Sequence, residues 1–179
     1  DLIHDVALLE EISGLVEWPV ALLGEVDTAF SDLPAEVLQA SMKEHQKFFS
    51  LKNSKTGKIE RFITVANIEA ADNGETILKG NQKVLYARLS DAKFFWENDI
   101  RLIQKDGLDA WLGKLVNVTF HNKLGSQADK VTRVSALTKI LAKRLSCDIE
   151  DAVKSANICK SDLASEMVYE FPELQGVMG

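Results

Sequence analysis

The first half of the chain alternates between helical and extended spacing of its apolar residues. In residues 1–17 they recur at a period near 3.6, which predicts an amphipathic helix. This helix is expected to end before Pro19, because the residue that precedes a proline is disfavoured in the α conformation. The continuous apolar run at 20–24 predicts a short buried strand. A second helix is predicted over 35–47, with Asp32 as its cap.

Residues 48–68 have the pattern of a β-hairpin. Two runs rich in aromatic and β-branched residues flank a polar turn. Asn53 and Gly57 are expected to supply the positive φ angles that such a turn requires. A long amphipathic helix is then predicted over 81–98.

The second half of the chain is dominated by helical spacing. Helical blocks are predicted at 101–117, 131–145 and 149–168. After residue 68 the only strand-like segment is the weak run 116–120. The pattern therefore changes from mixed to helical along the chain.

This change predicts an α+β protein made of two parts. An N-terminal α/β part with a short sheet and a hairpin is expected at 1–99. An all-helical part is expected at 112–179, and 100–111 lies between them.

Composition and charge narrow the classes of function. The chain has 179 residues, of which 46% are hydrophobic and 27% charged, as in a folded globular protein of one full domain or two small ones. Its 21 basic and 27 acidic residues give a net charge of −6, so contact with RNA requires a local basic patch or a basic partner. No apolar run is long enough to span a membrane, and the first residues lack the features of a signal peptide. Without an initiator Met, the sequence is expected to be a piece of a longer chain.

The residues that most often form metal and catalytic sites are few. Cys147 and Cys159 are expected to be free thiols in a reducing compartment. The three histidines, His4, His45 and His121, share no ligand spacing, so no His-rich metal site is predicted. No catalytic triad has support in the sequence either, and no catalytic residue is assigned.

A basic cluster at 42–49 is the most suggestive local feature. Lys43 and Lys47 are four residues apart on a predicted helix, so they can address neighbouring phosphates together. Arg88 and Lys93 on the next long helix form a second candidate pair, less well spaced. These four residues are the predicted nucleic-acid contacts. The alternative is that their side chains only lie over neighbouring apolar surface.

Eight ordered segments carry a resemblance to a known family. They are 16–19 (VEWP), 33–38 (LPAEVL), 41–47 (SMKEHQK), 81–85 (NQKVL), 87–95 (ARLSDAKFF), 120–126 (FHNKLGS), 159–163 (CKSDL) and 166–176 (EMVYEFPELQG). In this order they resemble the beta subunit of the bacterial heterotetrameric glycyl-tRNA synthetase. The resemblance runs from about residue 5 to the last residue.

The resemblance implies a function that composition alone does not indicate. Members of this family belong to an α2β2 aminoacyl-tRNA synthetase, a cytoplasmic ligase of protein biosynthesis that joins glycine to tRNA(Gly) with ATP and Mg²⁺. The aminoacylation site is expected on the alpha subunit, while the beta subunit supplies tRNA binding and subunit assembly. The present chain would be an internal fragment of the beta subunit, inactive by itself and without a cofactor of its own.

The helical part is similar to HD-type phosphohydrolase domains, whose active members bind a metal through histidine and aspartate. The corresponding segment at 158–162 has Lys160 where a histidine ligand is needed. A degenerate HD-like hydrolase that uses Asp129, Asp162 and His121 is therefore an alternative function. A purely structural scaffold is another. No metal ligand is assigned.

Overall fold

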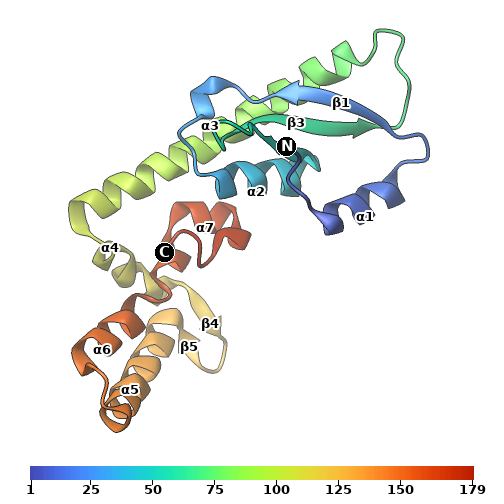
Figure 1. Ribbon diagram of the computed structural model, residues 1–179. Helices are drawn as coiled ribbons and strands as arrows, with labels where there is room; N and C mark the ends of the chain where they lie inside the picture. Colours follow the sequence, from blue (N-terminus) through green and yellow to red (C-terminus); the bar gives the residue numbers. More distant parts are fainter. The chain divides into compact units, whose positions relative to one another are not determined.

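A computed structural model describes all residues, 1–179, and the chain forms two compact units (Figure 1). Unit 1 is Asp1–Phe94 and unit 2 is Phe95–Gly179. The boundary falls inside the long helix α3 (Glu75–Asp106), which contributes to both units. None of the helices combines the length and the apolar character needed to cross a membrane.

Unit 1 is built around a three-stranded antiparallel sheet with the strand order β1-β3-β2. Its elements are α1 (Val6–Leu15), β1 (Val20–Glu25), the 3-10 turn η1 (Thr28–Phe30), α2 (Ala35–Gln46), β2 (Phe49–Lys52), β3 (Ile59–Ala66) and the first part of α3. The central strand β3 pairs with the whole of β1 through Arg61–Ala66, and with β2 on its other edge. The second strand of the hairpin, β3, therefore lies between β1 and β2.

Helices cover both faces of this sheet. Leu8 and Ile12 of α1 form an apolar cluster with Phe49 of β2 on one face. On the other face, the amide of Asn81 in α3 donates a hydrogen bond to Thr64 Oγ1 of β3 at 3.3 Å. The sheet is thus held between α1 and the N-terminal part of α3.

The tightest contact in the sheet joins β1 and β3. Gly24 lies directly opposite Phe62, and the Phe62 ring is fully buried over the glycine backbone. The same ring stacks on Phe48, with 4.6 Å between the ring centroids. A glycine at 24 leaves room for this ring, because a β-carbon there would lie inside van der Waals contact with three ring carbons.

Most predicted elements of unit 1 are confirmed, with three corrections. The strand at 20–24 and the helix and hairpin after it are present, and Gly57 adopts φ 70° in the hairpin turn. Asp32 does not cap α2, because Pro34 occupies the N-cap position and no side chain caps the helix. Asn53 does not adopt positive φ; its side-chain oxygen instead accepts a hydrogen bond from the Lys55 amide.

The third correction in unit 1 is that α3 begins at Glu75 rather than at 81. The Asp72 carboxylate accepts hydrogen bonds from the backbone amides of Gly74 and Thr76, which stabilises this earlier start of the helix. Asn73 and Gly74 before it both have positive φ, as a tight entry to the helix requires.

Unit 2 consists mainly of short helices. Its elements after α3 are α4 (Asp109–Leu112), η2 (Gly113–Asn117), β4 (Thr119–His121), β5 (Gly125–Ser126), α5 (Gln127–Leu145), α6 (Ile149–Ile158), η3 (Ser161–Ala164), α7 (Glu166–Glu170) and η4 (Pro172–Leu174). Helices α5 and α6 pack against each other as a hairpin (Figure 1). Cys147 and Cys159 are both free and exposed.

The α+β class is confirmed, but the expectation of an all-helical second part is wrong in detail. Strands β4 and β5 form a small antiparallel ribbon there. The predicted helix at 101–117 is broken, because Gly107 has φ 69° and its amide closes the end of α3 on the Ile103 carbonyl. The block at 149–168 likewise divides into α6, η3 and α7.

A buried carboxylate joins α3 to α7 within unit 2. Asp99 is 4% exposed and accepts hydrogen bonds from the backbone amides of Glu166 and Met167, at 3.1 and 3.0 Å. Burial raises the pKa of the Asp99 carboxyl above its ordinary value, although the two amide bonds oppose this shift. Asp99 therefore holds the first turn of α7 in place.

We predict that Gly24→Ala destabilises unit 1 by about 1–3 kcal/mol, because the added methyl group forces the Phe62 ring out of its stacked position. Urea unfolding followed by circular dichroism measures the change. The matched control is Gly14→Ala in α1, where an added β-carbon meets no atom within 4 Å, so stability is expected to stay equal or increase. Equal destabilisation by both variants would contradict this account.

We predict that Asp99→Ala destabilises unit 2 by about 1–3 kcal/mol, because the buried amide of Met167 and the part-buried amide of Glu166 lose their acceptor. The pKa of Asp99 is raised in the folded state, so its contribution is fully present below the unfolded pKa. It decreases as the pH rises through the folded pKa. Urea unfolding at several pH values measures this contribution as the difference in the free energy of unfolding between wild type and variant. A difference that increases with pH would contradict the prediction.

Candidate nucleic-acid interface

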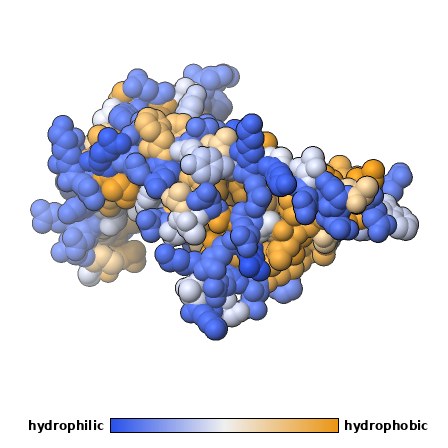
Figure 2. All heavy atoms as spheres, turned by 90° about the horizontal axis from the view of Figure 1, so that it is seen from above, coloured by the Kyte–Doolittle hydropathy of each residue, from blue (hydrophilic) through white to orange (hydrophobic).

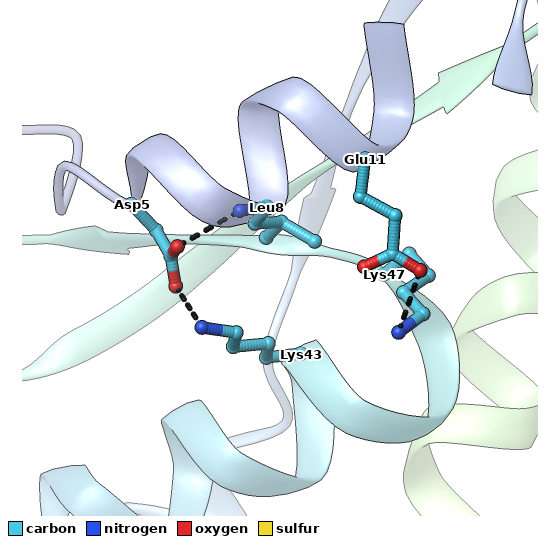
Figure 3. A network of polar contacts seen from close by, with 5 residues as sticks. All are labelled: Asp5, Leu8, Glu11, Lys43 and Lys47. Carbon is cyan, nitrogen blue, oxygen red and sulfur yellow. Dashed lines mark hydrogen bonds and ion pairs between the residues drawn. The ribbon is translucent and has the colours of Figure 1, made fainter. Parts of the chain in front are cut away.

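The two lysines of the predicted RNA contact face α1 (Figure 3). Lys43 Nζ lies 2.6 Å from Asp5 Oδ2, and Lys47 Nζ lies 3.0 Å from Glu11 Oε1. Lys43 belongs to the last turn of α2, whereas Lys47 is the residue after the helix and has a left-handed conformation with φ 55°. The structure thus brings the two lysines together, and it also gives each of them a carboxylate partner.

Asp5 has a second role in the same network. Its other carboxylate oxygen accepts a hydrogen bond from the Leu8 amide at 2.9 Å and caps α1 (Figure 3). The hydrogen bond from Lys43 lowers the pKa of Asp5, and the bond from the Leu8 amide adds to this effect. The same pair raises the pKa of Lys43. Both groups are therefore charged at neutral pH, and the pair fixes the end of α2 to the start of α1.

The two candidate residues on α3 do not share a surface. Lys93 donates a hydrogen bond to the Ala29 carbonyl at 2.9 Å. Arg88 is exposed and has no ion pair or hydrogen bond within the chain. Five residues separate the two, which is about 140° around an α-helix. Of the four predicted contacts, Arg88 is therefore the one whose charged group has no partner within the chain.

A groove in unit 1 contains polar residues that the sequence did not bring together. It has a volume of about 560 Å³ and lies between the end of β1 with η1 and the α3 side chains Gln82, Lys83 and Tyr86. Tyr86 packs edge-on against Phe30, with 5.1 Å between the ring centroids. The sequence indicates only one wall of this groove, because Lys83 and Tyr86 are three residues apart and share a side of α3. The opposite wall, at the end of β1 and in η1, could not be placed from the sequence.

The residues of the alternative hydrolase site each have a local structural contact. The Asp129 carboxylate accepts hydrogen bonds from Ser126 and forms a capping box at the start of α5. Asp162 is buried and accepts a hydrogen bond from the Gly176 amide. Nδ1 of His121 accepts a hydrogen bond from the Lys123 amide at 3.1 Å. No group of three or more His, Cys, Asp or Glu side chains in the chain is placed to hold a metal ion.

Sequence comparison defines the class of protein to which this fold belongs. The model of the family described as glycyl-tRNA synthetase beta subunit matches residues 1–179, so the chain belongs to this family of aminoacyl-tRNA synthetase subunits. It is 62% identical to the glycine–tRNA ligase beta subunit of Ruegeria sp. (strain TM1040) and 59% identical to that of Dinoroseobacter shibae, over 100% of this chain in both cases. The beta subunit of Paracoccus denitrificans is also 59% identical. The chain spans only 26%, 25% and 26% of the length of these three relatives.

We predict that the ion pair of Lys43 with Asp5 has a coupling free energy of about 0.2–1 kcal/mol in a double-mutant cycle, as is typical of partly exposed pairs. Asp5→Ala should cost more than Lys43→Ala, because only the aspartate also caps α1. The pKa of Asp5 is lowered, so this coupling is present above the unfolded pKa of the carboxyl and is lost as the pH falls through the folded pKa.

The control for this cycle is the pair of Lys79 with Glu75, whose atoms are 3.7 Å apart and whose side chains are largely exposed. Its coupling is expected to be close to zero. If the two pairs had the same coupling at neutral pH, the network around Asp5 would have no special structural role.

Proposed function

We propose that this chain contributes tRNA binding and subunit assembly to a glycine–tRNA ligase of α2β2 composition. In this proposal the alpha subunit carries the aminoacylation site, and the whole enzyme uses ATP and Mg²⁺ to attach glycine to tRNA(Gly). The observation that carries the proposal is the match to the beta-subunit family over all 179 residues, together with 62% identity to a beta subunit. The fragment by itself is proposed to be inactive.

Local basic groups, rather than the charge of the whole chain, are proposed to contact tRNA. A chain with a net charge of −6 repels a polyanion on average, so attraction depends on where cations gather. Lys43, Lys47, Arg88 and Lys93 remain the proposed phosphate contacts. Arg88 has the strongest structural support, because its guanidinium is exposed and not bonded within the chain. Lys43 and Lys47 would exchange a carboxylate for a phosphate, at a cost in the packing of α1 on α2.

We predict that Lys43→Gln together with Lys47→Gln raises the tRNA Michaelis constant of the full α2β2 enzyme severalfold. Each lost phosphate contact should also reduce the slope of log affinity against log salt by about one. Glycine activation, measured as ATP–pyrophosphate exchange without tRNA, should stay unchanged, because that chemistry is assigned to the alpha subunit. Arg88→Gln and Lys93→Gln are measured in the same way.

Matched variants separate an RNA contact from a purely structural role. Asp5→Asn breaks the same ion pair as Lys43→Gln, keeps a side-chain oxygen for the α1 cap, and leaves the lysine available. If Lys43 binds phosphate, the two substitutions change the tRNA Michaelis constant in opposite directions. If Lys43 only joins α1 to α2, they change it in the same direction. Glu11→Gln is the corresponding partner of Lys47→Gln.

A scaffold role is the second candidate, and one observation favours it. Three of the four nominated cations already bind groups within the chain, namely Asp5, Glu11 and the Ala29 carbonyl. In that case unit 1 would hold neighbouring parts of the enzyme without contacting tRNA. The HD-like character of the helical unit is also a proposal, which rests on the resemblance of its sequence. The contacts of Asp129, Asp162 and His121 give no support to a hydrolase function.

A further inference from the structure

Helix α5 exposes a continuous stripe of large aliphatic side chains. Val134, Leu137, Leu141 and Leu145 are spaced by three, four and four residues and so lie on one side of the helix. Their exposed fractions are 37%, 57%, 48% and 71%. We name these four residues the α5 stripe. Only Ala142 of the 19 residues of α5 is buried.

The stripe lies beside the contact that α5 already makes. The neighbouring side of the helix packs on α6, where Ser135 donates a hydrogen bond to Asn157. Both ends of α5 are well defined, by the capping box at Ser126 and by the left-handed Ser146. The bounds of the helix are therefore fixed by its caps, and the stripe lies beside the side of α5 that packs on α6. On the face shown in Figure 2, apolar side chains gather in patches that are bordered by hydrophilic ones.

The charge of α5 is opposite to that of the chain as a whole. The helix has five cations and one carboxylate, a net charge of +4, in a chain with a net charge of −6. Lys130 at its start lies over the Phe120 ring, 4.3 Å from the centroid. Arg133 and Arg144 fall next to the stripe on the side away from α6, by the helical period of 3.6 residues. An occupant of the stripe thus meets aliphatic groups with guanidinium groups along one margin.

An aliphatic stripe with arginines along one margin is suited to some binding partners and not to others. A phosphate backbone would meet four aliphatic side chains and lose hydration without a polar partner. A second copy of α5 would bring two strongly basic helices together. An amphipathic helix with carboxylates beside its own apolar stripe satisfies both features, since the apolar groups are buried and the arginines are paired.

We propose that the α5 stripe is the docking surface for an acidic amphipathic helix of the same polypeptide, outside residues 1–179. Two observations favour the same chain as the source. The related beta subunits are about four times as long as this chain, which covers 26% of the Ruegeria protein. The stripe also lies beside the side of α5 that packs on α6, as expected for a surface buried within one subunit, where the partner is held at high effective concentration. The inference rests on the beta-subunit context but not on contact with tRNA.

The experiment uses the full-length beta subunit assembled with the alpha subunit. A photoreactive amino acid replaces Leu137 or Leu141 in separate variants, and Lys139 in the control, since Lys139 lies on a different side of α5. After illumination without tRNA, cross-linked peptides are identified by mass spectrometry. We expect both stripe positions to cross-link to one segment of the beta chain that is apolar at helical spacing and carries Asp or Glu beside its apolar residues. The control position should not yield this product.

Isotope labelling identifies the source of the cross-linked segment. Heavy and light beta subunits are mixed before assembly, and a helix of the same polypeptide gives only heavy–heavy and light–light products. Mixed products, or cross-links to the alpha subunit, would overturn the proposal. So would cross-links to a segment without carboxylates, or to tRNA when it is added. Equal labelling from Leu137, Leu141 and Lys139 would show an uncovered surface and would also overturn it.

A measurement on the unmodified enzyme covers the case in which a variant fails to fold. Hydroxyl-radical oxidation of the full complex should leave Leu137 and Leu141 unreacted, because the docked helix excludes water from them. Oxidation at the level of half-exposed leucines would contradict docking. Neither experiment depends on tRNA kinetics, so the proposed tRNA contacts can fail while the docking proposal stands, and the reverse also holds.

Discussion

The position of Phe62 on the central strand governs the packing of unit 1. Its ring covers Gly24 on one neighbouring strand and stacks on Phe48, which precedes the other. The ring of Phe62 therefore contacts β1 and the residue before β2, the two strands that pair with β3. Because protein interiors are close-packed, a side chain at position 24 would overlap the Phe62 ring unless the ring or one of the two strands moved. The surfaces that carry the candidate lysines depend on this arrangement, since α1 and α2 adjoin the same sheet.

The ion pairs between α1 and α2 connect stability to the proposed function. A lysine held by a carboxylate at the surface gains little free energy from the pair, and the pair is weakened by salt. The same lysine therefore remains available to a phosphate of higher charge density, provided that α1 tolerates the loss. Arg88 has no such competitor within the chain. If Lys43 and Lys47 contact RNA as proposed, Asp5 and Glu11 compete with it at two of the four positions, which a count of basic residues does not reveal.

The two units differ in how completely their apolar residues are buried. In unit 1 helices cover both faces of the sheet, and Leu8, Phe62 and Leu89 are almost inaccessible to solvent. In unit 2 the buried residues gather around Trp111 and Met167, while α5 keeps one apolar side exposed. A long helix held mainly by one neighbour has few tertiary contacts, so its stability depends on its caps and on whatever covers its stripe. This contrast is the structural basis for expecting a further helix at α5.

The sequence by itself determined the α+β class, the hairpin, the position of β1 and α2, and the family, because these follow from local periodicity, turn residues and ordered motifs. It also placed Lys43 and Lys47 side by side, since helical spacing is a local property. It could not reveal that Asp5 and Glu11 meet these lysines, because that contact joins residues more than 30 positions apart through the packing of α1. The break at Gly107 and the cap at Asp72 were missed because a single residue overrode the apolar period around it. Only the tertiary structure decided which charges are already paired and which side of α5 remains uncovered, because both depend on which elements pack against which.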